Sequence, residues 1–198
     1  MNEVLRFNQE AISRSSVLAQ LNLVSGEYLL ASFHRQENVE DFGRLTTIVT
    51  SIERLAKQRG LRVIVSTHPR TRNRLTEMGY AASGQIILSE PFGFHDYVSL
   101  QQNALCVLSD SGSISEESAI LGFPAVVLRK AIERPESIES GSVIVAGIDE
   151  ESIDSSLKVA LGERPIKACP ADYQDGDFSS KVISFLFSTQ GRYDFWKG

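Results

Sequence analysis

The stretch "SDSGSISEESAILGFPAVVLR", residues 109–129, contains the arrangement that decides the fold. A hydrophobic run ends at Asp110 and is followed by Ser-Gly-Ser. Residues 113–122 then have helical spacing, and Gly-Phe-Pro leads into a second hydrophobic run. A buried strand, a helix and another buried strand in this order predict one parallel crossover unit.

The same pattern continues on both sides of this stretch. Six short apolar runs are too continuous for half-exposed strands and too short for stable helices, so we expect buried parallel strands. These runs are residues 27–33, 61–67, 85–90, 104–110, 124–129 and 142–147. Helical segments are expected at 41–60, 113–122 and 150–162; in the first, Leu45, Ile48, Ile52 and Leu55 share one face and Gly60 ends the helix. The prediction is a doubly wound, Rossmann-like α/β sheet of about six strands, formed by residues 1–198 as a single domain.

The two ends of the chain have a different character. Residues 2–20 are predicted to form one amphipathic helix with Leu5, Ile12 and Leu18 among its apolar positions. The last segment is rich in apolar and aromatic side chains, which suggests contact with a partner surface. The apolar and aromatic residues of this segment are Phe185, Leu186, Phe187, Tyr193, Phe195 and Trp196.

Composition excludes several classes of partner. Lys and Arg total 20 against 25 Asp and Glu, a formal net charge of −5, so we expect no nucleic-acid and no anionic-membrane binding. No apolar stretch approaches the roughly 20 residues that span a bilayer, and the first residues lack a signal-peptide core. Two cysteines provide neither a disulfide framework nor a zinc site. A cytoplasmic protein is expected.

Polar residues collect where the predicted strands end, which is where α/β sheets bind ligands. A helix is expected to begin at Ser111, Gly112 and Ser113, and the backbone amides of a first helical turn attract an anion such as phosphate. The alternative is a capping box formed by Ser113 and Glu116, which would satisfy those amides internally. Glu117 suits the hydroxyls of a ribose or an ordinary solvated helix position.

Other candidates also have two interpretations. His34 and His68 each end a strand beside arginines, where a phosphate would lie, although a lone histidine is usually structural. Phe94 and Tyr97 suit a flat base or the core. No third ligand accompanies His34 and Glu37, so no metal is expected. The dinucleotide, Walker and serine-hydrolase motifs are absent.

Five motifs together resemble the UDP-N-acetylglucosamine 2-epimerase family: "SFHRQEN", "HPRT", "DSGSISEE", "LGFPAVVLR" and "ERPES". The resemblance covers about residues 27–186, and "SFHRQENVED" is most similar to the branch acting on UDP-2-acetamido-2,6-dideoxy-L-talose. It implies one half of a glycosyltransferase-B-type two-domain fold, namely the C-terminal, UDP-binding half without the N-terminal domain. It also implies a homodimer at full length, in bacterial capsule or O-antigen synthesis.

The resemblance further implies a role for each site residue. The reaction would invert C2 of a UDP-2-acetamido sugar through anti elimination of UDP and its re-addition, with no cofactor and no metal. The acid/base carboxylates would come mostly from the other domain, so this chain alone would bind UDP without turnover. The implied roles are diphosphate binding by Ser111, Gly112 and Ser113, ribose binding by Glu117, uracil contact by Phe94 and Tyr97, proton donation by His34, phosphate contact by Arg134, and a second, activating UDP-sugar site at Arg35 and His68.

Two alternatives remain at this point. A glycosyltransferase donor domain shares the fold and the UDP site, and a non-catalytic nucleotide-sugar sensor would bind without reaction.

Overall fold

The computed structural model describes residues 1–130, 134–162 and 169–190. Its strands are β1 Tyr28–Ser32, β2 Arg62–Ser66, β3 Ile86–Ser89, β4 Cys106–Ser109, β5 Ala125–Leu128 and β6 Val143–Ala146. Its helices are α1 Asn2–Phe7, α2 Gln9–Ser13, α3 Val17–Gln20, α4 Gln36–Val39, α5 Phe42–Arg59, α6 Pro69–Glu77, α7 Phe94–Asn103, α8 Ile114–Leu121, α9 Pro135–Glu139, α10 Glu150–Ala160, the 3-10 helix Ala171–Tyr173 and α11 Phe178–Thr189.

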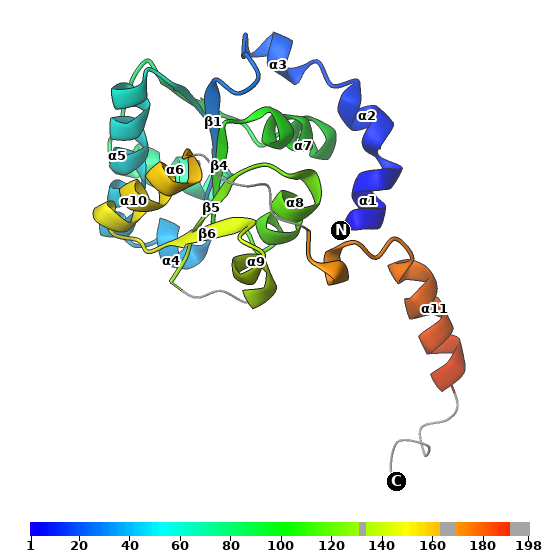
Figure 1. The fold of residues 1–198 in the computed structure, drawn as a ribbon. Coiled ribbons are helices and arrows are strands. Elements are labelled where there is room, and N and C mark those ends of the chain that lie inside the picture. The colour runs from blue at the N-terminus through cyan, green and yellow to red at the C-terminus, as the bar shows by residue number, and fades with distance from the viewer. Residues whose placement is uncertain (131–133, 163–168, 191–198) are drawn as a thin grey trace.

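All six strands form one parallel sheet in the order β3-β2-β1-β4-β5-β6 (Figure 1). This is the order of a doubly wound sheet, in which the direction of winding reverses between β1 and β4. Every strand lies within one of the six predicted apolar runs, and α5, α8 and α10 lie within the three predicted helical segments. The predicted fold class is therefore confirmed.

The sheet is covered on both faces because its strand residues alternate between two apolar cores. Leu29, Ala31 and Leu108 belong to the core under α5, α6 and α10. Leu30 and Val107 point to the opposite core, under α3, α7 and α8. In Figure 1, α5 and α10 lie on one side of the sheet, with α7 and α8 on the other. None of the described helices is long and apolar enough to cross a bilayer.

The prediction of one continuous helix over residues 2–20 was wrong. The structure has the three short helices α1, α2 and α3, interrupted at Asn8 and again at Ser15 and Ser16. Short polar side chains compete with helical hydrogen bonds for backbone groups. Ser15 Oγ accepts a hydrogen bond from the Val17 amide at 3.2 Å and donates one to Asp96 Oδ1 at 2.6 Å, which turns the chain along α7. Leu5 and Ile12 are nevertheless buried, as expected for an apolar face.

Four neighbouring strands end in serine at the same level of the sheet. The register pairs Ser32 with Ser109 and Ser66 with Ser89, and the pairing of Ala31 with Val65 places Ser32 beside Ser66. We call Ser89, Ser66, Ser32 and Ser109 the serine row. Small hydroxyl side chains at this edge leave room above the ends of the central strands.

Helix α11 extends away from the sheet (Figure 1). It carries a broad apolar surface, including Phe185, Leu186 and Phe187, which are 60%, 58% and 74% exposed. Its first turn is held to α1, since Ser179 Oγ donates a hydrogen bond to Glu3 Oε2 at 2.6 Å. The aromatic residues Tyr193, Phe195 and Trp196 lie outside the described residues.

Candidate functional site

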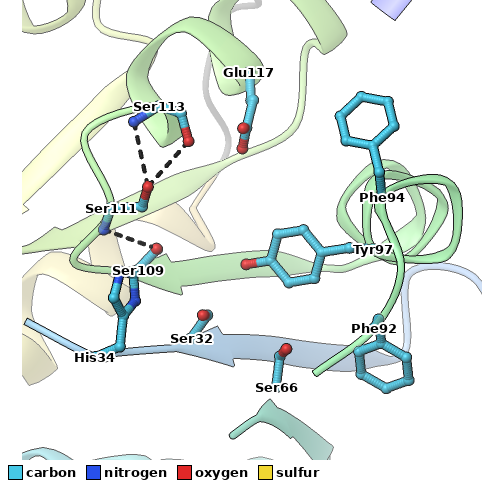
Figure 2. A pocket seen from close by; sticks show the side chains of 10 residues that line it. All are labelled: Ser32, His34, Ser66, Phe92, Phe94, Tyr97, Ser109, Ser111, Ser113 and Glu117. Atoms are coloured by element: carbon cyan, nitrogen blue, oxygen red, sulfur yellow. Dashed lines mark hydrogen bonds between the residues drawn. The ribbon is translucent and has the colours of Figure 1, made fainter. Parts of the chain in front are cut away.

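An open pocket of about 240 Å³ lies at the carboxyl edge of the sheet, next to the point where the winding reverses (Figure 2). Three members of the serine row form its floor, and the turns after β1, β3 and β4 form its walls. Its lining residues are Ser32, His34, Ser66, Phe92, Phe94, Tyr97, Ser109, Ser111, Ser113 and Glu117. Six of the residues selected from the sequence are thus at or beside one cavity: His34, Phe94, Tyr97, Ser111, Ser113 and Glu117.

The turn Ser111–Ser113, which we call the serine turn, is held by serine hydroxyls, two of its own and that of Ser109. The Ser111 amide donates to Ser109 Oγ at 3.1 Å, and the hydroxyls of Ser111 and Ser113 lie 3.0 Å apart, as Figure 2 shows. Ser113 makes no side-chain capping bond to α8. Among the described residues no group accepts a hydrogen bond from the backbone amides of residues 112 and 114–116. These open amides at a helix N-terminus are suited to bind an anion.

The capping box, one of the two alternatives for Ser113 and Glu116, is therefore not formed, and Glu116 has other partners. Its carboxylate lies 2.7 Å from Arg134 Nη1, and that nitrogen also donates to the carbonyl oxygen of Gly112 at 2.6 Å. Arg134 thus binds the outer side of the serine turn and is not among the residues that line the pocket. The position supports the turn, while its predicted contact with phosphates stays a prediction.

Glu117 is buried beside the pocket in the first turn of α8, with 9% of the residue exposed. Its Oε2 accepts a hydrogen bond of 2.6 Å from Gln101 Nε2 on α7. Among the described residues no donor reaches its other oxygen, Oε1. Figure 2 shows the carboxylate directed toward the cavity rather than toward solvent. An acceptor of this kind suits a ligand hydroxyl.

Three aromatic rings form one wall of the pocket. Phe94 and Tyr97 are on α7, whereas Phe92 precedes the helix and was not selected from the sequence (Figure 2). Phe94 is 41% exposed, so its ring is accessible to a flat ligand. Burial raises the pKa of the Tyr97 phenol well above its ordinary value, so the hydroxyl keeps its proton near neutral pH.

His34 is positioned by a buried carboxylate from another strand. Asp110, fully buried after β4, accepts hydrogen bonds from the backbone amides of His34 and Arg35 at 2.9–3.1 Å. Its Oδ1 also lies 3.4 Å from His34 Nδ1. Asn38 Nδ2 donates to Asp110 Oδ2 at 3.1 Å. The His34 side chain is 45% exposed and lines the pocket.

Arg35 and His68 lie close to His34. Arg35 Nε donates to the carbonyl oxygen of Asp110 at 2.8 Å. The His68 ring centroid is 5.9 Å from that of His34, and its Nδ1 accepts the Arg70 amide at 3.2 Å at the start of α6. The two residues are near the pocket without lining it, and the second UDP-sugar site remains a prediction.

Several residues of the site were missed in the sequence. Asp110 and Asn38 stood inside quoted motifs without a role, and Gln101 and Phe92 were not considered. The signal that the sequence offered for the serine row was the serine that ends each of these four apolar strands. In the part of the chain that the structure describes, no three His, Cys, Asp or Glu side chains come together in a way that could hold a metal ion.

Comparison with known proteins identifies a family that this chain matches. The family model described as UDP-N-acetylglucosamine 2-epimerase matches residues 1–187. A curated relative, the UDP-N-acetylglucosamine 2-epimerase of Methanococcus maripaludis, is 33% identical over 165 residues, which are 81% of this chain and 44% of the relative. The chain spans about half the length of the curated relatives it matches.

Solved structures match in the same way. A Methanocaldococcus jannaschii UDP-GlcNAc 2-epimerase, solved in complex with UDP-GlcNAc and UDP, superposes with a TM-score of 0.85 at 30% identity, covering 94% of this chain and 52% of the other. An Escherichia coli ADP-heptose heptosyltransferase II gives a TM-score of 0.55 at 12% identity, covering 73% of this chain and 50% of the other. The second likeness shows a shared fold alone.

Proposed function

The chain belongs to the UDP-N-acetylglucosamine 2-epimerase family, and from this membership we propose that its pocket binds the UDP part of a UDP-2-acetamido sugar. The observation that carries the proposal is the juxtaposition of four open backbone amides, a buried carboxylate and an exposed phenylalanine around one cavity. These three groups suit a diphosphate, a ribose and a base respectively.

The diphosphate would lie against the serine turn. Hydroxyls and amides at the N-terminus of α8 donate hydrogen bonds to phosphate oxygens, and the helix dipole adds a favourable potential there. Arg134 donates to the carbonyl of Gly112 and pairs with Glu116, which reduces the negative potential that a diphosphate at the turn would meet. The turn is therefore preorganised for negative charge.

The reaction that suits this site is inversion of C2 by elimination and re-addition. The C1–O bond to UDP breaks while a base removes the C2 proton, which leaves a C1=C2 double bond; UDP then adds back after a proton reaches C2 from the opposite face. Donors at the serine turn and His34 would stabilise the charge on departing UDP. The base would be supplied by the other half of an enzyme of the relatives' length.

The whole protein is also part of the proposal. We propose that the exposed apolar surface of α11 packs against that other half, and that the complete enzyme is a homodimer serving surface-polysaccharide synthesis in the cytoplasm. The branch acting on a 2,6-dideoxy-L-talose sugar stays a prediction. The glycosyltransferase alternative has support only from a shared fold, which does not specify chemistry.

Calorimetric titration of this chain with UDP and with UMP tests the proposal. We expect UDP to bind about tenfold more tightly than UMP, because the second phosphate adds hydrogen bonds to a charged group at the serine turn. Ser111→Ala should reduce the preference for UDP, and Glu117→Ala should weaken both ligands.

A matched control is Glu151→Ala, which removes a carboxylate from the exposed first turn of α10, and it should change neither affinity. Equal affinity for UDP and UMP, or full affinity in Ser111→Ala, would contradict the placement of the diphosphate at the serine turn.

A further inference from the structure

We infer that Asp110 is a positioning residue, which holds the imidazole of His34 with its proton on Nδ1 and its Nε2 directed to the ligand. The two residues come from different strands, separated by 76 positions, and the turns after β1 and β4 bring them together. The role of Nε2 toward UDP rests on the proposed function, whereas the state of the ring does not.

The two oxygens of Asp110 have different surroundings. Oδ2 accepts from the amides of His34 and Arg35 at 3.0 and 2.9 Å and from Asn38 Nδ2 at 3.1 Å. Oδ1 accepts from the His34 amide at 3.1 Å and lies 3.4 Å from His34 Nδ1. With Asp110 fully buried and receiving these donors, its carboxylate is fixed in place.

A fixed carboxylate oxygen beside Nδ1 selects one state of the ring. A carboxylate only accepts hydrogen bonds, so the neutral imidazole is stabilised when its proton is on Nδ1. The two ring nitrogens point in different directions, so Nε2 stays available to a ligand in the pocket that the half-exposed side chain lines. The same carboxylate stabilises an imidazolium that donates from Nε2 to a phosphate oxygen.

Asp110 also joins this ring to the serine turn. It immediately precedes Ser111, and its carbonyl oxygen accepts Arg35 Nε at 2.8 Å. The ring of His34 and the open amides of α8 are thereby kept at a constant separation, so that both can contact one diphosphate.

His68 provides an internal reference for a direct test. Its Nδ1 accepts the Arg70 amide, so neutral His68 must have its proton on Nε2. Long-range 15N–1H NMR of histidine-labelled protein in alkaline buffer distinguishes the two neutral tautomers. We expect His34 and His68 to show opposite tautomers, with signals assigned through His34→Gln and His68→Gln. The same tautomer in both residues would overturn the inference, without any variant of Asp110.

Asp110→Asn should reverse the tautomer of His34. An amide oxygen in the place of Oδ2 keeps an acceptor for all three N–H groups. The amide nitrogen in the place of Oδ1 loses the 3.1 Å bond from the His34 amide and faces Nδ1 as a donor. The proton of His34 should move to Nε2, and His68 should not change. A folded Asp110→Asn protein in which the His34 tautomer is unchanged would also overturn the inference.

UDP titration separates this role from a purely structural one. We expect His34→Gln and Asp110→Asn each to weaken UDP about tenfold, and the double variant to lose no more than either alone. Asp149→Asn, a change of the same type at the cap of α10, should leave the affinity unchanged. If the two losses add, Asp110 acts on the serine turn and not through His34. If wild-type protein binds no UDP, the proposed function fails, and the NMR result still decides the state of the ring.

Discussion

Recognition of the ribose can be tested by changing the protein and the ligand together. Glu117 Oε2 accepts a hydrogen bond from Gln101 Nε2 at 2.6 Å, Oε1 has no donor among the described residues, and the side chain lines the cavity. If a ribose hydroxyl donates to this carboxylate, 2′-deoxy-UDP should bind less tightly than UDP, because a hydrogen bond to a charged group contributes about 1.5–3 kcal/mol. That energy corresponds to an affinity difference of about 10- to 150-fold.

Glu117→Ala should abolish this difference. Without the carboxylate, UDP and 2′-deoxy-UDP should bind with equal affinity within about a factor of two, both more weakly than UDP binds wild type. Isothermal titration of both proteins with both ligands gives the four affinities. A ratio that stays above tenfold in Glu117→Ala would refute the assignment, since the 2′-hydroxyl would then be bound elsewhere.

Stability must be measured in the same preparation. Removing the Glu117 carboxylate leaves the buried Gln101 amide without its acceptor, which should cost about 1–3 kcal/mol of unfolding free energy. For a chain of this size that is a decrease in Tm of roughly 2–4 °C per kcal/mol. Because Glu117→Gln keeps a carbonyl acceptor for Gln101, it should recover most of the stability while recovering little of the discrimination between the two ligands.

Three further outcomes concern stability. Gly122 ends α8 at φ 79°, so Gly122→Ala should lower the unfolding free energy by about 1 kcal/mol through backbone strain. The control Gly84→Ala should cause no such loss, because a Cβ at residue 84 meets open space and the residue has no positive φ. Equal unfolding free energies of the two variants in urea denaturation would contradict this. Leu108→Ala removes a fully buried side chain from β4 and should cost about 2–5 kcal/mol by the same assay; a loss below 1 kcal/mol would contradict the packing. Tyr173 Oη donates a hydrogen bond to Glu136 at 2.6 Å and holds the pKa of that carboxyl below its ordinary 4.5. The stability that this hydrogen bond contributes is therefore fully present above pH 4.5 and is lost as the pH falls through the lowered pKa. Tyr173→Phe should therefore flatten the acid dependence of Tm, and an unchanged slope would argue against it.

The fold could be predicted from local patterns because each apolar run encloses one strand and extends only one or two residues beyond either end of it. Burial on both faces removes the polar alternation of an exposed sheet, so the runs stand out from the helices between them. The prediction of one helix over residues 2–20 failed because the spacing of apolar residues does not show where a helix is interrupted. The interruption at Ser15 depends on Asp96, which is 81 positions away in the chain.

The site was predictable as far as single motifs extend. Ser111 and Glu117 lie within one strand–helix unit. Their spacing fits a ligand site and a helix cap equally well, and the resemblance to a family favoured the ligand. The decision between ligand and cap depends on Arg134, which pairs with Glu116 across 18 positions. The partners of Asp110 and Glu117 come from other elements, and only the sheet order and the packing of α7 against α8 bring them together.

The serine row has a consequence for how the pocket distinguishes its ligands. No lysine or arginine is among the ten lining residues, so a bound anion meets hydroxyl and amide dipoles and one imidazole instead of mobile cations. Attraction by short-range dipoles is screened far less by dissolved salt than attraction between separated ions. Nucleotide affinity of this chain should therefore change little between low and high ionic strength. Selectivity would then come from the shape of the cavity and the direction of its hydrogen bonds. The negative charge of another polyanion would not by itself be enough for binding.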